Sequence, residues 1–143
     1  MSTINCKGTL IDLSTPKVMG IVNVTPDSFF DGGKLTDADA VVFQVEKMLQ
    51  EGATFIDLGG YSSKPGAEFV SETEELNRVI PVVKLLVEKF LDILLSIDTF
   101  RSEVAKQAIE NGAALINDIS AGLLDENMLE TVAKLQVPYI MMH

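Results

Sequence analysis

The chain has 143 residues, of which 47% are apolar, and its 11 basic and 21 acidic side chains give a formal net charge of −10. This length and apolar content indicate one globular domain with a sizeable core. The acidic balance argues against a nucleic-acid partner, because the overall field repels phosphate backbones. An anionic small molecule would therefore have to meet local hydrogen-bond donors.

The sequence shows no sign of a membrane or secretory segment. Its apolar runs, such as residues 79–83, are far too short to span a bilayer, and residues 1–8 lack the basic and apolar regions of a signal peptide. The single cysteine, Cys6, allows no intrachain disulfide, and with no histidine before the last residue it is a poor candidate nucleophile. We therefore expect a cytoplasmic protein without a membrane partner.

Short apolar runs rich in β-branched residues alternate along the chain with stretches of helical periodicity. This alternation predicts βαβ units around a parallel sheet. Ahead of them, residues 5–12 suit a hairpin with Gly8 at its turn, which we expect to plug the bottom of the sheet. The strands are expected at residues 18–23, 54–58, 93–98, 115–117 and 137–142, and the helices at residues 38–49, 71–90, 104–109 and 127–135.

The second of these helices carries both a start signal and a breaker. Ser71 followed by Glu74 matches a capping box, so the helix should begin there. Pro81 lacks an N–H and clashes with the preceding turn, so we expect a kink or a restart of the helix at this residue.

Each apolar strand ends on a polar side chain that would be costly to bury without a partner. In a parallel sheet the carboxyl ends of the strands share one rim, and α/β barrels and doubly wound sheets place their ligands there. One such Asp is often only the N-cap of the next helix, but a series of polar ends favours a shared site. The polar ends are Asn23, Asp57, Asp98, Asn117 with Asp118, and His143.

The loop after the first strand separates two α/β architectures. Residues 22–27 contain neither G-x-G-x-x-G nor a P-loop pattern, which disfavours a nucleotide-binding doubly wound sheet. We therefore predict an α/β fold of the (β/α)8 TIM-barrel type with an N-terminal β-hairpin. Because a complete barrel needs about 250 residues, residues 1–143 are expected to form the amino-terminal part of a single barrel domain, roughly strands 1–5.

Two loops at this rim carry further candidate binding groups. The loop after the first strand contains glycines and the rings of Phe29 and Phe30, which either serve a ligand or tuck back on the core. The glycine-rich loop at residues 59–66 offers backbone amides, the hydroxyl of Ser63 and the ammonium of Lys64, which suit an anion. The second loop therefore predicts an oxyanion or pyrophosphate clamp.

The segments that carry these candidates form four motifs. They are MGIVNVTPDSF at residues 19–29, IDLGG with PGA at residues 56–60 and 65–67, SIDT at residues 96–99, and INDI at residues 116–119. Together they resemble the signatures of the dihydropteroate synthases, a family of pterin-binding TIM barrels, over nearly the whole chain.

The departures from the family pattern are few. The family commonly has Glu, Thr and Arg where this chain has Tyr61, Ser63 and Lys64. Ser63 keeps the hydroxyl, whereas Lys64 keeps the charge but not the bidentate fork of a guanidinium. Arg101 stands where a lysine is usual.

The resemblance implies an enzyme that joins p-aminobenzoate to (7,8-dihydropterin-6-yl)methyl diphosphate, releasing pyrophosphate and forming 7,8-dihydropteroate. It implies Mg²⁺ as cofactor, with Asn23 as the magnesium-linked catalytic position. Asp98 is implied as the second catalytic residue, because its carboxylate can stabilise positive charge on the pterin methylene. The family also implies a homodimer for a full-length chain.

The remaining roles implied by the resemblance concern substrate binding. Asp98 and Asn117 would bind the pterin, and Asp57 would orient Asn23 or a loop amide, unless it only caps a loop. The other implied contacts are Ser63 and Lys64 with the pyrophosphate, Phe29 or Phe30 with the aminobenzoate ring, and Ile119 and Met141 as walls of the pterin slot or as core residues.

Two alternatives stay open. Another pterin-binding barrel, such as a methyltetrahydrofolate methyltransferase domain, would share the strand-end Asp and Asn, although residues 25–33 and 65–67 argue against it. A non-catalytic barrel fragment would follow if the missing half holds the basic residues that complete an anion site. An assay of this chain by itself discriminates between these readings.

Overall fold

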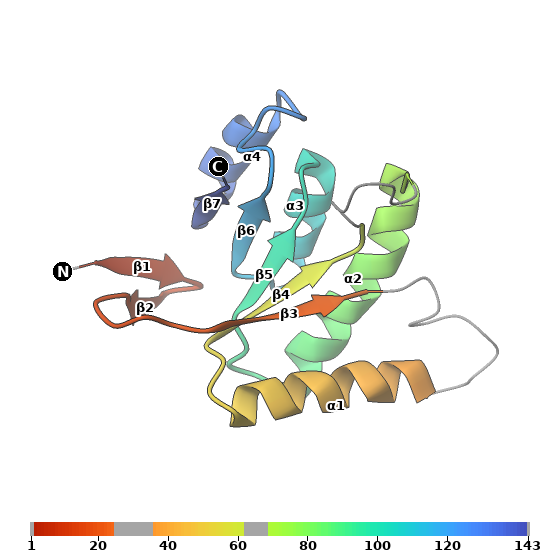
Figure 1. Cartoon of the computed structure of the whole chain (residues 1–143). Coiled ribbons are helices and arrows are strands. Elements are labelled where there is room, and N and C mark those ends of the chain that lie inside the picture. The colour runs from red at the N-terminus through yellow and green to blue at the C-terminus, as the bar shows by residue number, and fades with distance from the viewer. Residues whose placement is uncertain (1, 25–35, 62–68, 143) are drawn as a thin grey trace.

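The fold was obtained as a computed structural model that describes residues 2–24, 36–61 and 69–142. A two-stranded antiparallel sheet precedes a five-stranded parallel sheet (Figure 1). The strands are β1 (Thr3–Cys6), β2 (Thr9–Asp12), β3 (Met19–Asn23), β4 (Phe55–Gly59), β5 (Leu95–Asp98), β6 (Leu115–Asp118) and β7 (Tyr139–Met141). The helices are α1 (Thr36–Gln50), α2 (Glu72–Lys89), α3 (Ser102–Glu110) and α4 (Met128–Leu135).

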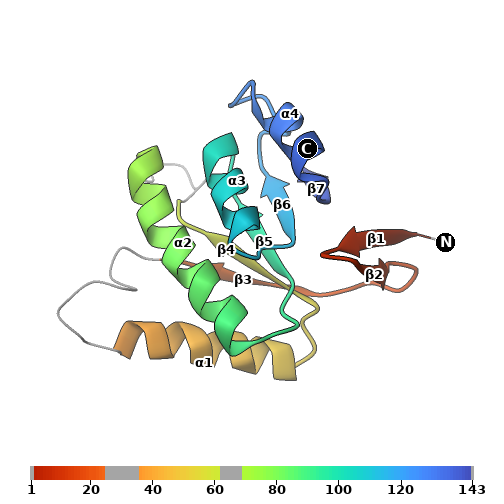
Figure 2. The same cartoon turned by 180° about the vertical axis from the view of Figure 1, so that it is seen from behind.

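The parallel strands lie in the order β3-β4-β5-β6-β7, so each strand pairs with the next one along the chain. Figure 2 shows the four helices on one face of this sheet. A doubly wound sheet would reverse its strand order and place helices on both faces. The sequential order with helices on one side is that of a partial (β/α) barrel, as the sequence predicts.

Alternate residues of the parallel sheet face opposite sides. Val22, Leu58, Ile97 and Ile116 pair in register and are at most 1% exposed, because they pack under the helices. We call the opposite side, which the helices leave uncovered, the inner face. Its residues include Asn23, Asp57, Ser96, Asp98 and Asn117, which alternate with the helix-covered set.

Helix α2 begins as predicted but does not restart. Ser71 is its N-cap and accepts a hydrogen bond from the Glu74 N–H at 3.1 Å. Pro81 lies inside the continuous helix, at a cost of about 3 kcal/mol for the lost hydrogen bond and the clash. The fully buried Val79 and Val82 on either side of Pro81 hold both halves against the sheet, so core packing outweighs this cost.

The N-terminal hairpin is also confirmed. Lys7 and Gly8 form its turn, both with positive φ (55° and 86°), as a tight two-residue hairpin requires. Cys6 is fully buried in a small cluster with Phe55 and Leu115, so the hairpin covers the amino end of the sheet. Burial raises the pKa of the Cys6 thiol, which agrees with a structural rather than a nucleophilic role.

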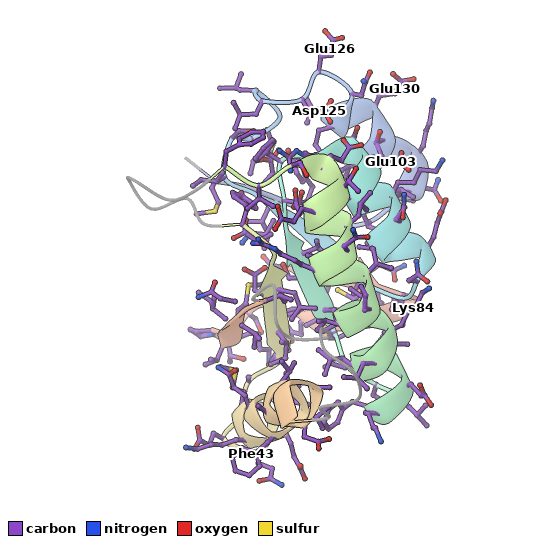
Figure 3. The ribbon with its side chains drawn as sticks, turned by 90° about the vertical axis from the view of Figure 1, so that its right-hand side faces the viewer. Phe43, Lys84, Glu103, Asp125, Glu126 and Glu130 are labelled. Atoms are coloured by element: carbon purple, nitrogen blue, oxygen red, sulfur yellow. The ribbon has the colours of Figure 1, made fainter. Side chains whose placement is uncertain are left out.

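The outer surface of the helices is polar with isolated apolar side chains. Figure 3 shows Lys84 and Glu130 projecting away from α2 and α4, and Phe43 projecting from α1. The Phe43 side chain is 69% exposed. No helix within residues 36–61 and 69–142 is long and apolar enough to cross a membrane.

Candidate active site at the strand ends

The ends of four neighbouring strands form one row on the inner face. Asn23 pairs in register with Gly59, Gly59 with Asp98, and Asp98 with Asn117. A Cβ atom at Gly59 would lie 3.4 Å from Oδ2 of Asp98. The Asp98 side chain therefore lies above β4, in the direction of Asn23, over space that the glycine leaves free.

Asp57 lies below this row and is only 3% exposed. Its Oδ1 accepts a hydrogen bond from the Ser96 hydroxyl at 2.6 Å, and its carboxylate lies 3.4 and 3.5 Å from the amide nitrogen of Asn117. Burial raises the pKa of Asp57, while the hydrogen bonds from Ser96 and Asn117 oppose that rise. Among the described residues, the side chains that hydrogen-bond to Asp57 are thus Ser96 and Asn117 rather than Asn23, and the alternative of a loop amide stays a prediction.

The contact with Asp57 also decides which way the Asn117 amide faces. A carboxylate only accepts hydrogen bonds, so the Nδ2 of Asn117 must face Asp57 and Oδ1 must face away. That oxygen is buried, and no described residue donates a hydrogen bond to it. A buried acceptor without a donor is costly, so Oδ1 is suited to accept an N–H from a bound molecule.

Asp98 is a carboxyl group in surroundings that disfavour its charge. Burial, the nearby charge of Asp57 and smaller contributions from Glu75 and Asp118 raise the pKa of Asp98 to about 6, although a hydrogen bond from Tyr61 lowers it. That bond runs from the Tyr61 hydroxyl to Oδ1 of Asp98 at 3.1 Å. At neutral pH the group is mostly ionised, and a positive charge beside it would be favoured.

Tyr61 is held from the side by a stack of aromatic and basic groups. Its ring meets Phe100 edge to face with centroids 5.3 Å apart, and the guanidinium of Arg101 lies 4.7 Å from the centroid of Phe100. Arg101 in turn donates to Glu75 at 2.8 Å and to the carbonyl of Val70 at 2.7 Å. The planar Arg101 thus joins α2 to the loop after β5, which a lysine could not do in the same way.

Asp118 has a structural role, unlike the preceding Asn117, whose Oδ1 accepts no hydrogen bond from the described residues. Its carboxylate accepts hydrogen bonds from the backbone N–H groups of Ser120 and Gly122 and from the Tyr139 hydroxyl at 2.6 Å. It therefore fixes the loop after β6 and the start of β7.

Several predicted site residues cannot be placed. Phe29, Phe30, Ser63, Lys64 and His143 lie outside the described residues. Of the others, Ile119 and Met141 are 37% and 56% exposed in this chain, and their role as walls of a pterin slot or as core residues stays a prediction.

Sequence reasoning missed two side chains that contact the predicted site. Ser96 is two residues before Asp98 in an otherwise apolar strand, and this spacing could have placed it on the same face. Tyr61 was noticed only as a departure from the family pattern. No pattern in the chain indicates its contact with Asp98.

The comparisons with known proteins show which family the chain belongs to. The family described as pterin binding enzyme matches residues 19–143. A dihydropteroate synthase of Streptococcus pyogenes serotype M1 is 49% identical over 126 residues, which cover 88% of this chain and 47% of that protein.

Solved structures give the same picture. The Xanthomonas albilineans dihydropteroate synthase with 4-aminobenzoic acid has a TM-score of 0.86 and 46% identity, covering 99% of this chain and 52% of that one. The same enzyme in complex with 7,8-dihydropteroate has a TM-score of 0.82 and 44% identity, covering 99% and 51%. The chain thus spans about half the length of these relatives, and over that half it belongs to the pterin binding enzyme family.

Proposed function

We propose that this chain forms half of the active site of a dihydropteroate synthase, which condenses p-aminobenzoate with (7,8-dihydropterin-6-yl)methyl diphosphate. The products would be 7,8-dihydropteroate and pyrophosphate. The observation that carries the proposal is the buried Oδ1 of Asn117, which accepts no hydrogen bond from the described residues, in a strand-end residue that pairs in register with Asp98 on the inner face. The match to the pterin binding enzymes over residues 19–143 supports it.

Recognition of the pterin would use the strand-end row. A pterin carries N–H groups on a flat heterocycle, and Oδ1 of Asn117 can accept one of them. Asp57 would keep the Asn117 amide in this orientation, because its carboxylate holds Nδ2. Ile119 and Met141 would provide apolar walls at the end of β6 and β7.

The chemical step would be a substitution at the pterin methylene. The amine nitrogen of p-aminobenzoate forms a bond to this carbon, the bond from the carbon to the diphosphate oxygen breaks, and its electron pair leaves with pyrophosphate. The nitrogen then loses a proton to solvent. Positive charge develops on the methylene as the diphosphate departs, and the Asp98 carboxylate would stabilise it. With a pKa of about 6, Asp98 is available as a carboxylate at neutral pH.

The donor set fits a magnesium ion that arrives with the diphosphate. No cluster of three or more His, Cys, Asp or Glu side chains that could hold a metal occurs among the described residues. Mg²⁺ commonly keeps waters and uses one or two protein oxygens together with substrate phosphates, and the exposed amide oxygen of Asn23 could be such a ligand. Bound there, the ion would supply neutralisation of charge on the leaving group.

The two loops would complete the site. Ser63 and Lys64 would hold the pyrophosphate, and Phe29 or Phe30 would pack against the aminobenzoate ring while excluding water. The Xanthomonas albilineans relatives bound to 4-aminobenzoic acid and to 7,8-dihydropteroate support this choice of substrates. A cytoplasmic location and a homodimer of the longer protein belong to the same proposal.

Calorimetric titration of the pterin diphosphate with Mg²⁺ into the 143-residue chain tests the proposal. Saturable binding that Asp98→Ala abolishes is expected. Asp92→Ala is the matched control, because this exposed aspartate precedes the opposite end of the same strand and should leave binding unchanged. Equal binding by all three chains would reject the role of Asp98, whereas no binding by the folded wild-type chain would favour a non-catalytic barrel fragment.

A further inference from the structure

We propose that Tyr61 is a positioning residue for Asp98: its hydroxyl holds Oδ1, so that Oδ2 is the oxygen presented over Gly59 to a bound ligand. The inference rests on the proposed function only in naming that ligand as the pterin diphosphate. The position of Tyr61 and its contact with Asp98 can be tested in the chain without any ligand.

The two oxygens of Asp98 have different surroundings. Oδ1 accepts the hydrogen bond from the Tyr61 hydroxyl at 3.1 Å. Oδ2 lies 3.4 Å from the position that a Cβ of Gly59 would occupy, on the side of the carboxyl that leans across β4. Because a tyrosine donates one hydrogen bond, it can occupy one oxygen and leave the other for a ligand. The hydrogen bond therefore selects the rotation of the carboxyl group.

Packing holds the side chain of Tyr61 in one orientation, as a positioning residue requires. Its ring packs edge to face on Phe100, which lies beside the guanidinium of Arg101. The Arg101 side chain is 11% exposed and is paired with the fully buried Glu75. A side chain whose rotamer is fixed by packing can orient a neighbour, whereas a loosely held one cannot.

The charges around Asp98 explain why it needs a donor. Asp57 on β4, Glu75 on α2 and Asp118 on β6 all act against its ionised form. Arg101, which lies beside Phe100 in the same loop, directs its hydrogen bonds to Glu75 and Val70 instead. The hydrogen bond that the Tyr61 hydroxyl donates favours the ionised form of Asp98 in these surroundings.

The first experiment compares the wild-type chain with Tyr61→Phe, which keeps the ring and removes only the hydroxyl. The titration midpoint of the Asp98 carboxyl carbon, followed by NMR in the absence of ligand, is expected to move to higher pH by about one pH unit. Tyr139→Phe is the matched control, because it removes the other tyrosine hydroxyl that donates to an aspartate, Asp118. It should leave the Asp98 midpoint unchanged.

A second readout follows the binding of the pterin diphosphate as a function of pH. If Asp98 binds as a carboxylate, affinity falls as the pH drops through its pKa, and in Tyr61→Phe this fall should begin at higher pH. A Tyr61 that only fills space predicts the same Asp98 midpoint and the same pH profile in wild type and Tyr61→Phe. That result would overturn the inference, and Tyr61→Leu would then change stability alone.

The two proposals fail in distinguishable ways. A shifted Asp98 midpoint in Tyr61→Phe without any pterin binding by the wild-type chain would retain the positioning role and reject the pterin site. Pterin binding by the wild-type chain with an unshifted midpoint in Tyr61→Phe would retain the site and reject the positioning role.

Discussion

The side-chain amide of Asn117 on β6 reaches past the intervening strand β5 to the carboxylate of Asp57 on β4, with Nδ2 3.4 Å from Oδ2. The hydroxyl of Ser96 on β5 lies 2.6 Å from the other oxygen of that carboxylate. One buried acidic group therefore links three neighbouring strands beneath the row of strand-end residues. This link connects the stability of the sheet to the orientation of Asn117.

Removal of this carboxylate should destabilise the fold. In Asp57→Ala the Ser96 hydroxyl and the Asn117 amide lose their acceptor, which is expected to lower the free energy of unfolding by about 1–3 kcal/mol. Urea unfolding followed by circular dichroism measures the change. Asp39→Ala on the exposed side of α1 is the control and should stay within about 0.5 kcal/mol of wild type. The prediction would be contradicted if Asp57→Ala lowered the free energy of unfolding by no more than Asp39→Ala does.

Asp98 should make stability depend on pH. Its pKa of about 6 lies above the ordinary value of 3.8, so between these values the folded chain holds a proton that the unfolded chain has lost. The free energy of unfolding should therefore fall as the pH rises from about 4 to about 6 and level off above that range.

The Asp98→Asn variant isolates this contribution, because Asp57 and Glu75 also have a raised pKa and act in the same direction. Urea unfolding of both chains between pH 4 and 7 should show the variant gaining stability relative to wild type as the pH rises. A difference that does not change with pH would show that Asp98 titrates normally.

The ion pair between Arg101 and Glu75 should matter more than a surface pair. Its side chains are 11% and 0% exposed, so Arg101→Met leaves a buried carboxylate without its positively charged partner and should cost about 3–5 kcal/mol. The double variant with Glu75→Met should recover part of this loss. In the exposed pair of Lys134 and Glu130, Lys134→Met should cost less than about 1 kcal/mol. Urea unfolding measures the free energy of unfolding of each variant. If Arg101→Met and the double variant lose the same amount of stability, the buried charge of Glu75 is not the cause of the loss.

Asp125 should act as the cap of α3 from a distant loop. The N-cap residue Arg101 provides no side-chain hydrogen bond, whereas Oδ2 of Asp125 accepts from the Ser102 N–H at 2.7 Å. Asp125→Ala is expected to cost about 1 kcal/mol, and hydrogen exchange of the first turn of α3 should become faster. The neighbouring Glu126 extends into solvent (Figure 3), so Glu126→Ala is a suitable control that should change neither quantity.

The cap should also be sensitive to acid. Burial alone would raise the pKa of Asp125, but hydrogen bonds from the backbone N–H groups of Ser102 and Asn127 lower it overall. A lowered pKa in the folded chain means that the stabilisation is present at neutral pH and is lost as the pH falls through that pKa. The difference between wild type and Asp125→Ala should therefore shrink in acid, and a constant difference would contradict an ionised cap.

The sequence by itself determined the order of the elements and the face on which the site lies. Periods of two and 3.6 residues reflect how each side chain is buried, so the alternation of strands and helices followed from them. The polar ends at Asn23, Asp98 and Asn117 were readable because parallel strands place their carboxyl ends on one rim. Of the kink or restart expected at Pro81, the restart was wrong, because a local rule for proline takes no account of the buried valines around it.

Only the tertiary structure decided which of these polar groups meet. The contacts of Asp57 with Asn117 and of Tyr61 with Asp98 join residues 60 and 37 positions apart. Both depend on strand register and on rotamers chosen by packing, neither of which leaves a periodic signal in the chain. Local patterns report the environment of a single residue, whereas the identity of its hydrogen-bond partner is a property of the assembled sheet.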